Sequence, residues 1–326
     1  MAGGFTTPEL VAAVSNAGAL GSLGAGYLQP QEIQNVLRRI KSLTNCPFNV
    51  NTFVEKVETI AQDISPVLEK LHCFWQEVSE EPFTPFISSL PSFEKQIDVL
   101  LAEKIPVFSF TFGTPPLELI RRFQQQGTLV FGTATTPEEA QELEEIGVDA
   151  IVCQGFESGG HRGNFSSQDP FLGLSALLAL TKSRVTTPLI AAGGIMNGRG
   201  VRAALALGAD AAQLGTAFLT TAESGAHPTY KQALLQKPAR PTRISQAFTG
   251  KPARAIVNRF MEVLDLLQVP TYPVQHCLTA KLRALAAEKG RPDLMSLWAG
   301  QGYPLCQSIS AVELIRQITQ EIALPF

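Results

Sequence analysis

The chain repeats one local pattern twice, and this pattern constrains its fold more than any other feature. A helix-like segment ends at Gly147 and again at Gly208, and each glycine is followed by one residue, an aspartate, an alanine and an apolar run. Glycine at the end of such a segment is typical of a helix C-terminus. A short apolar run bounded by turn residues is typical of a buried strand. The repeat therefore predicts an α/β fold with a parallel sheet.

Seven short apolar runs fit this alternation, and most are separated by helix-like segments. They are residues 20–23, 48–53, 107–112, 129–133, 150–154, 188–192 and 211–214. Threonine three residues before glutamate, with proline in the first turn, predicts helix starts at Thr6 and Thr136. The predicted fold is a (β/α)8 TIM barrel. Residues 1–4 resemble the loop that follows a strand, so we expect an eighth strand before Met1 and a truncated first strand in this chain.

Two stretches interrupt the alternation. The segment between residues 53 and 107 is too long for one simple crossover, and we expect it to extend over an edge of the barrel. Residues 223–304 contain helical runs separated by prolines, which predicts a helical lid inserted before the last barrel helix. The predicted domains are thus a barrel, residues 1–222 with 305–326, and a helical subdomain, residues 223–304, on the substrate side.

A glycine-rich turn follows the expected strand at residues 150–154. Residues 154–163 place four glycines around His161. Glycine lets backbone amides approach a ligand, because no Cβ stands in the way. Imidazole titrates near neutral pH, so His161 is a candidate for proton transfer or for stabilising an anion. The alternative is a glycine-rich loop with an incidental histidine.

Two further pairs of small residues end the last two expected strands. They are Gly193 with Gly194, and Gly215 with Thr216. In (β/α)8 barrels the loops after the last two strands frequently bind phosphate. Backbone amides and a hydroxyl group suit such an anion. The two pairs together therefore predict a phosphate site, although each pair alone is weak evidence.

Charge and cysteine content exclude several classes of protein. The net charge is −3 and no Lys/Arg block occurs, so we expect no nucleic-acid partner. No apolar run reaches the roughly 20 residues that span a bilayer, and no basic-then-apolar leader is present. We therefore expect no membrane partner and a cytoplasmic location. The five cysteines are odd in number and lack CxxC spacing, which predicts neither a disulfide framework nor a metal site. Cys153 is expected in the core.

Five ordered segments resemble the nitronate monooxygenase family, formerly called 2-nitropropane dioxygenase. They are residues 1–10 (MAGGFTTPEL), 48–53 (FNVNTF), 159–163 (GGHRG), 191–195 (AAGGI) and 213–218 (QLGTAF). The family consists of FMN-dependent TIM-barrel enzymes. The resemblance implies FMN as cofactor and oxidation of alkyl nitronates, with nitroalkanes as a further candidate, by dioxygen to carbonyl compounds and nitrite.

The resemblance and the strand positions together assign roles to residues. His161 is the candidate catalytic residue, as a base toward a nitroalkane or as a partner of an anionic nitronate. The candidate cofactor-binding residues are Met1 beside the flavin ring, Asn51, Gln154 and Gln213 at strand ends, Gly159 in the turn, Gly193, Gly194, Gly215 and Thr216 around the phosphate, and Leu214. Asn51 also fits a turn, and Arg162 fits either an anionic substrate group or an acidic neighbour. The other histidines, His72, His227 and His276, are expected to be structural or solvated.

Two rival interpretations remain open at this stage. One is another FMN-dependent barrel that uses NAD(P)H, such as an enoyl-acyl-carrier-protein reductase. The other is a barrel that binds flavin or phosphate without catalysis. The expected partners of the enzyme are a small nitronate or nitroalkane and dioxygen, and the sequence is compatible with a monomer or a homodimer.

Overall fold

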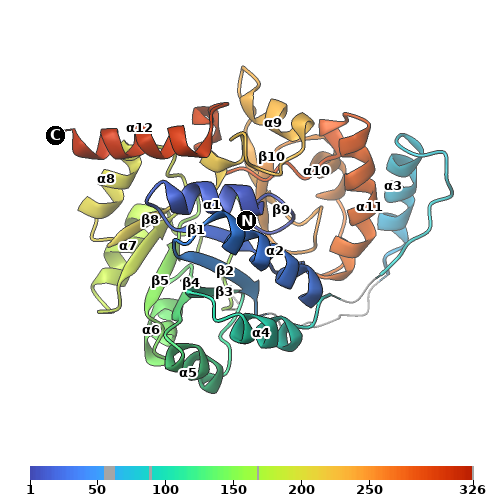
Figure 1. The fold of residues 1–326 in the computed structure, drawn as a ribbon. Coiled ribbons are helices and arrows are strands. Elements are labelled where there is room, and N and C mark those ends of the chain that lie inside the picture. Colours follow the sequence, from blue (N-terminus) through green and yellow to red (C-terminus); the bar gives the residue numbers. More distant parts are fainter. Residues whose placement is uncertain (55–62, 88–89, 167–168, 325–326) are drawn as a thin grey trace.

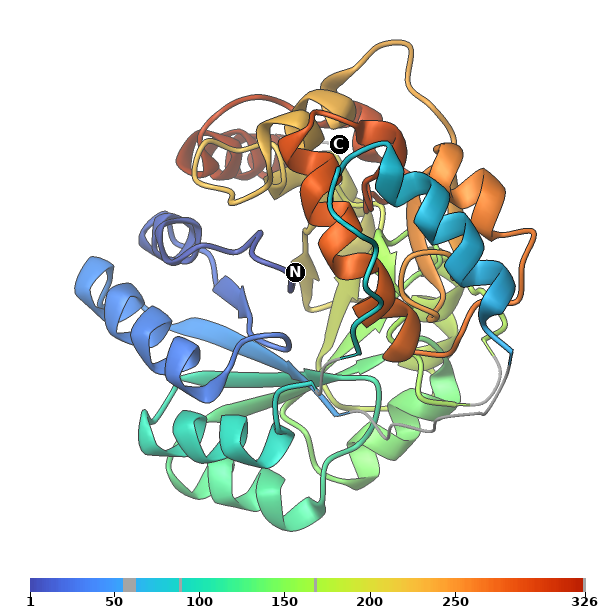
Figure 2. The same cartoon turned by 90° about the vertical axis from the view of Figure 1, so that its right-hand side faces the viewer.

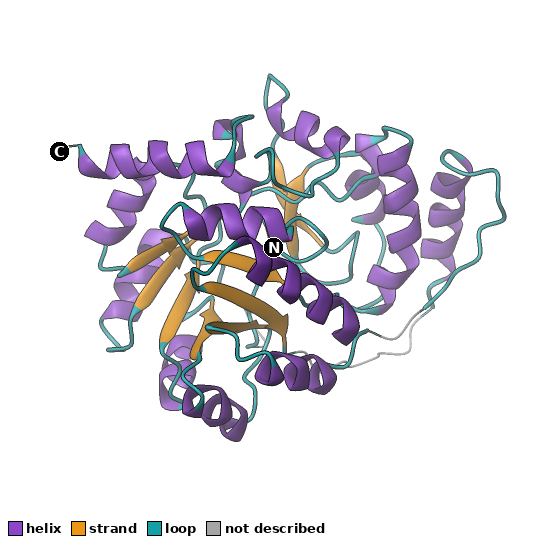
Figure 3. Cartoon of the chain, in the orientation of Figure 1, coloured by secondary structure: helices purple, strands orange, loops and turns teal. Residues whose placement is uncertain are grey.

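A computed structural model gives the structure of residues 1–54, 63–87, 90–166 and 169–324. A curled parallel sheet with helices on its outer side forms the barrel region, and a mostly helical lid stands over one end of that sheet (Figures 1 and 3). The view in Figure 2 shows the lid helices beside the first strands and helices of the barrel. This arrangement corresponds to the (β/α)8 type of fold that the sequence predicts.

The barrel sheet contains seven parallel strands in the order β1-β2-β3-β4-β5-β7-β8. Their bounds are Gly21–Gly24 for β1, Phe48–Phe53 for β2, Val107–Thr111 for β3, Leu129–Ala134 for β4, Ala150–Gln154 for β5, Leu189–Ala192 for β7 and Ala211–Gln213 for β8. Each of the seven expected strands is confirmed to within one residue at either end. Strands β1 and β8 are the two edges of the sheet, and no eighth strand joins them within the residues described.

The repeated aspartates explain why the pattern recurs. Asp149 Oδ2 accepts a hydrogen bond from Val130 N at 2.7 Å, at the start of the neighbouring strand β4. Asp210 Oδ2 does the same for Leu189 N at 2.9 Å, at the start of β7. In both places the aspartate satisfies a strand-end amide that would otherwise lack a partner. The same device thus sets the start of two parallel strand pairs.

The outer layer of the barrel is helical. Its helices are α1 (Pro8–Asn16), α2 (Pro30–Leu43), α4 (Phe93–Ala102), α5 (Leu117–Gln125), α6 (Pro137–Glu145), α7 (Leu174–Lys182), α8 (Gly198–Ala206) and α12 (Ala311–Ala323). Helix α12 packs against both α8 and α1 (Figure 1). The helical layer therefore continues from the last strand of the sheet to the first, although β8 and β1 do not pair.

The lid contains strands as well as helices. Its helices are α9 (Pro228–Leu235), α10 (Arg259–Leu264) and α11 (Val274–Glu288), with short 3-10 turns η1 (Thr216–Phe218), η2 (Pro292–Leu294) and η3 (Tyr303–Leu305) nearby. Strands β9 (Thr242–Ser245) and β10 (Ala253–Ile256) form an antiparallel sheet with β6 (Gly160–His161). The sequence predicted a helical lid and a glycine-rich turn around residues 160–161, and the small sheet of β6, β9 and β10 corrects both predictions.

The long connection between β2 and β3 reaches the lid, as expected for a segment that leaves the barrel. Its helix α3 (Ser65–Gln76) packs against α10 and α11 (Figure 1). Leu71, Phe74 and Trp75 of α3 are buried in the apolar core of the lid. Residues 55–62 and 88–89 of this connection lie outside the described residues.

Two apolar cores support the two regions. The barrel core lies between the sheet and its helices and includes Phe108, Phe123 and Ile151. It also contains Cys153, which is fully buried, so the interpretation of this cysteine as a core residue is confirmed. The lid core is separate and includes Phe248 and Phe260. Among the described residues, no helix is long and apolar enough to cross a membrane, and no group of three or more His, Cys, Asp or Glu side chains is arranged to hold a metal ion.

Candidate active site

A cavity of about 520 Å³ lies between the carboxyl ends of the barrel strands and the lid. This is the end of the sheet at which barrel enzymes carry their active sites. The cavity collects nearly all of the predicted site residues: Met1, Asn51, Gln154, Gly159, His161, Gly193, Gly194, Gln213, Gly215 and Thr216. Leu214 does not line it, because its side chain packs against the apolar cores behind the strand end.

The glycine pair after β7 has a backbone that only glycine adopts readily. Gly193 has φ = 115° and Gly194 has φ = 72°, both in the left-handed region. A Cβ on Gly193 would also overlap the hydroxyl of Ser158. The pair turns sharply at the end of the strand and lines the cavity with backbone. Opposite the end of β8, Thr216 Oγ1 accepts from Gly300 N at 3.0 Å and still has its own hydrogen to donate.

Gly159 is required for a different reason from the one that the sequence suggested. A Cβ at this position would overlap the backbone of Ala299 and Gly300. The residue therefore lets the loop after β5 pack against the last part of the lid. Gly159 and Gly300 both line the cavity.

The barrel strands contribute a polar floor. Asn51 lies inside β2, so its interpretation as a turn residue is wrong, and its Nδ2 donates to Ser109 Oγ at 3.0 Å. The neighbouring Asn49 donates from Nδ2 to Ser22 Oγ at 2.7 Å and to Ser109 Oγ at 2.8 Å. Its Oδ1 is buried and has no hydrogen-bond partner among the described residues. A buried acceptor without a partner is costly, so this atom calls for a donor from a ligand in the cavity.

Met1 is held at the cavity by Thr6. Thr6 Oγ1 donates to Met1 O at 3.1 Å and accepts from Gly24 N at 2.9 Å. The cap of α1 is Thr7, whose Oγ1 accepts from Leu10 N at 3.0 Å, so the prediction of Thr6 as the helix cap is wrong. Thr136 does cap α6, as predicted. The hydroxyl that the sequence assigned to a helix end thus fixes the first residue beside β1.

His161 lies where the barrel meets the lid. Its backbone pairs with Ala253 of β10, and its Nε2 lies 2.9 Å from Thr249 Oγ1. The ring is tilted against Trp298, with 5.4 Å between the ring centroids. Burial lowers the pKa of His161 to about 3, and the positive charge of Lys251 acts in the same direction. The imidazole is therefore neutral at physiological pH, and the role of an imidazolium facing an anion does not fit the site.

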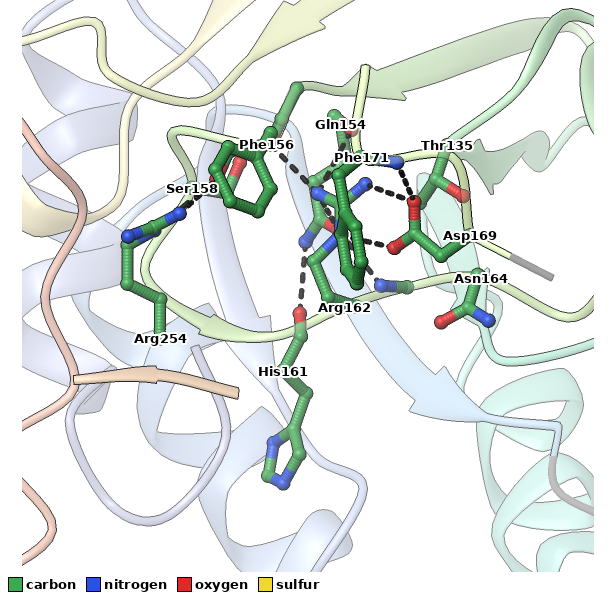
Figure 4. A network of polar contacts seen from close by, with 12 residues as sticks. Thr135, Gln154, Phe156, Ser158, His161, Arg162, Asn164, Asp169, Phe171 and Arg254 are labelled. Carbon is green, nitrogen blue, oxygen red and sulfur yellow. Dashed lines mark hydrogen bonds and ion pairs between the residues drawn. The ribbon is translucent and has the colours of Figure 1, made fainter. Parts of the chain in front are cut away.

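A buried ion pair braces the backbone that carries His161 (Figure 4). Arg162 is fully buried, and its Nε donates to Asp169 Oδ2 at 2.6 Å. Arg162 also donates to Gly155 O at 2.8 Å, and Gln154 Nε2 donates to His161 O at 3.1 Å. In Figure 4 the imidazole points away from this network while the carbonyl of His161 faces it. Of the two roles considered for Arg162, the structure thus supports the acidic neighbour rather than an anionic substrate group.

The lid side of the cavity contains residues that the sequence did not identify. His276 stacks on Tyr27, with ring centroids 4.7 Å apart and an interplanar angle of 7°. Both residues line the cavity, as do Trp298 and Arg283. His276 was expected to be structural or solvated, and the structure places it in the cavity wall, where a structural role and a role in binding are both open. No sequence pattern marked it, because it lies in the first turn of a helix whose other side belongs to the lid core.

Comparisons with known proteins agree with this geometry. The family model described as nitronate monooxygenase matches residues 1–321. A probable nitronate monooxygenase from Bacillus subtilis (strain 168) is 41% identical over 98% of this chain and 94% of the relative. The structure of nitroalkane oxidase from Streptomyces ansochromogenes has a TM-score of 0.94 at 41% identity, and the match covers 99% of this chain and 94% of that one.

A second group of solved structures is less similar. FabK from Thermotoga maritima has a TM-score of 0.76 at 30% identity, and the match covers 98% of this chain and 91% of that chain. The nitroalkane oxidase is therefore closer both in sequence and in backbone. With a matching family model along almost its whole length and relatives at about two-fifths identity, the chain belongs to the nitronate monooxygenase family of oxidoreductases.

Proposed function

We propose that the protein oxidises alkyl nitronates, and nitroalkanes as a second class of substrate, with bound FMN and dioxygen, giving a carbonyl compound and nitrite. The observation that carries the proposal is the position of His161, a neutral imidazole at the junction of a backbone-lined barrel wall and a ring-lined lid wall. Such a cavity holds a neutral base in a fixed place, which suits removal of a proton from a carbon acid.

The cavity residues fit FMN. Gly193, Gly194, Gly215 and Thr216 would hold the phosphate through backbone amides and a hydroxyl. Asn49, Asn51 and Gln213 are candidates for hydrogen bonds to the edge of the flavin ring. Among these, Asn49 has an Oδ1 without a partner in the described residues. Gln154 contributes less to the flavin than the sequence suggested, since both ends of its amide already bind the loop that carries His161. When bound, FMN supplies the electron acceptor that no side chain of the cavity provides.

The contacts of His161 indicate which ring nitrogen is the base. Thr249 Oγ1 is within 3.3 Å of Lys251 O, to which it donates. With that hydrogen given to Lys251 O, we infer that Nε2 of His161 donates to Thr249 Oγ1 and that Nδ1 is the unprotonated nitrogen. We infer that Nδ1 removes the α-proton of a nitroalkane. A nitronate has already lost this proton, so His161 would only orient it.

Two anaerobic mixing experiments test the proposal. FMN-loaded protein is mixed with propyl nitronate in one experiment and with NADPH in the other, and the visible absorbance of the flavin is followed. Rapid bleaching with the nitronate, and none with NADPH, is expected. Bleaching with NADPH alone would favour the reductase alternative, and no bleaching with either would favour a binding protein without catalysis.

The expected binding partners and the expected cellular location follow from the same proposal. We expect only small molecules, a nitronate or nitroalkane and dioxygen, to enter the cavity, and we place the enzyme in the cytoplasm. A monomer and a homodimer both remain compatible with the fold. Light scattering on the FMN-loaded protein distinguishes the two states.

A further inference from the structure

Arg283 is a cation in the lid wall of the cavity, and its hydrogen-bond partners among the described residues are all neutral. It belongs to α11 and lines the cavity. Its Nε donates to Thr279 Oγ1 at 3.1 Å, its Nη1 to Ser296 Oγ at 3.2 Å and its Nη2 to His276 O at 3.3 Å. Nη2 also lies 3.4 Å from His276 Nδ1. A guanidinium has five N–H groups, so these four contacts hold the group in place and leave one N–H, on Nη1, for a ligand.

Two buried arginines near the site, Arg162 and Arg254, are compensated differently. Arg162 is paired with the carboxylate of Asp169. Arg254 donates to Phe156 O at 2.9 Å and lies over the ring of Phe156, with the carboxylate of Glu157 close enough to raise its pKa. Arg283 has no carboxylate partner among the described residues, and only Tyr27 and Cys277 act to raise its pKa against the effect of burial. That pKa is about 10, so the side chain stays protonated at neutral pH.

Arg283 is partly buried. A charge that is partly removed from water and has no counter-ion is costly, which indicates that an anion completes the site. Arg283 lies on the lid side, close enough to His161 for its charge to lower the pKa of that imidazole. The glycine pairs that suit a phosphate lie on the opposite side, at the ends of β7 and β8. The anion that pairs with Arg283 is therefore expected to be the substrate that contacts His161, and not the phosphate of the cofactor.

We propose that Arg283 is the substrate-binding residue that recognises the negative charge of the nitronate, so that the cavity selects the anion over the neutral nitroalkane. This inference rests on the proposed function. The two oxygens of a nitronate lie in one plane and match the fork of a guanidinium, as a carboxylate does. Arg283 thus takes one of the two roles considered for His161, the partner of the anionic nitronate, and leaves His161 free to act as a neutral base.

The test compares three variants of the FMN-loaded enzyme. Arg283→Gln removes the charge but keeps donors for Thr279 and Ser296, and Arg283→Lys keeps the charge without the fork. Lys281→Gln removes a positive charge from the exposed face of the same helix and is the matched control. Steady-state kinetics with propyl nitronate and with neutral nitropropane give KM and kcat for each variant. Calorimetric titration with sodium nitrite measures anion binding without turnover.

For Arg283→Gln we expect KM for the nitronate to rise about 10- to 100-fold, the range for loss of a charge-assisted hydrogen bond. KM for nitropropane should change less than threefold, and nitrite binding should weaken in parallel with the nitronate. For Arg283→Lys we expect a KM for the nitronate between those of the wild type and Arg283→Gln. For Lys281→Gln we expect the KM and the nitrite affinity of the wild type.

Three results would overturn the inference. They are equal changes of KM for the anion and the neutral compound, unchanged nitrite affinity in Arg283→Gln, and loss of FMN from Arg283→Gln, which would place Arg283 in the cofactor site. A wild-type enzyme that oxidises no nitronate would refute the proposed function instead. In that case nitrite binding alone decides whether Arg283 binds an anion, and its absence in the wild type counts against the inference.

Discussion

The two walls of the cavity are built by different means. The barrel wall consists of backbone and short polar side chains at strand ends, such as Gly193, Asn51 and Thr216. The lid wall consists of rings and charged or ionisable side chains, such as Trp298, His276 and Arg283. Strand ends in a parallel sheet are held by the sheet itself, so the first wall offers fixed donors with little freedom. The second wall depends on side-chain packing across several lid segments.

This contrast indicates a division of labour. A fixed wall of amides suits a cofactor that stays bound, whereas rings and a cation suit a small substrate that enters and leaves. His161 stands between the two because its strand β6 pairs with β10 of the lid while its loop begins at β5 of the barrel. The following changes test the division, from the largest expected effect to the smallest.

A carboxylate on the barrel wall should remove the cofactor and with it all activity. Gly194→Asp places a negative charge where we expect the phosphate, and like charges repel strongly at short range. Gly194→Asn is the matched control, because asparagine has the same size and also tolerates positive φ. The ratio of flavin to protein, measured by absorbance, should fall to near zero only in the aspartate variant. Full FMN content in Gly194→Asp would refute the phosphate site, and equal loss in both variants would point to backbone strain.

A change of His161, which lies between the two walls, should leave FMN bound and lower the rate of the reaction. His161→Asn keeps a polar group in place but is no useful base, which typically costs about 10²- to 10⁴-fold in rate. The loss in kcat/KM should be large for nitroalkanes and smaller for preformed nitronates, which need no proton removed. Equal losses for both would mean that His161 acts in binding rather than as a base. Wild-type rates with both substrates would exclude His161 from catalysis.

Loss of the buried ion pair between Arg162 and Asp169, next to His161, should reduce the free energy of unfolding. Asp169→Asn leaves the buried guanidinium of Arg162 without its counter-ion, which typically costs about 3–5 kcal/mol. Denaturant unfolding measures this change in the free energy of unfolding. Glu9→Gln is the control, because its pair with Arg39 is exposed and should contribute less than about 1 kcal/mol. Similar decreases in the free energy of unfolding for the two variants would show that the buried pair stabilises the protein no more than the exposed pair.

The contrast between the walls also explains what the sequence could predict. Barrel strands are short apolar runs that end in glycine, asparagine or glutamine, and this local pattern located nearly every barrel-wall residue, including Gly193, Gly194 and Gln213. Leu214 was included with its neighbours, although alternation along the strand turns its side chain into the core. Thr6 and Thr7 were confused because either can precede a helix, and only the backbone decides.

The lid wall could not be predicted, because its residues meet only through tertiary packing. Tyr27 and His276 are far apart in the chain, yet their rings stack, and nothing local to either marks the contact. Strand β10 was missed for a similar reason, since its partner β6 contains only two residues. The neutral state of His161 depends on burial by several segments, so the residue type alone left both the charged and the neutral imidazole open.

The smallest effect that we predict is a pH dependence of stability that originates in the lid wall. In the folded protein the pKa values of His161 and His276 are lowered to about 3, mainly by burial, whereas an unfolded histidine titrates near pH 6.5. The unfolded chain thus binds more protons between these limits, and the free energy of unfolding falls as the pH drops below about 6.5. His276→Gln should reduce this slope between pH 6.5 and 5 by at most about 1.4 kcal/mol per pH unit. The control His72→Gln, on the exposed side of α3, should leave it unchanged. Equal slopes in all three proteins, measured by denaturant unfolding, would mean that His276 is not buried in its neutral form.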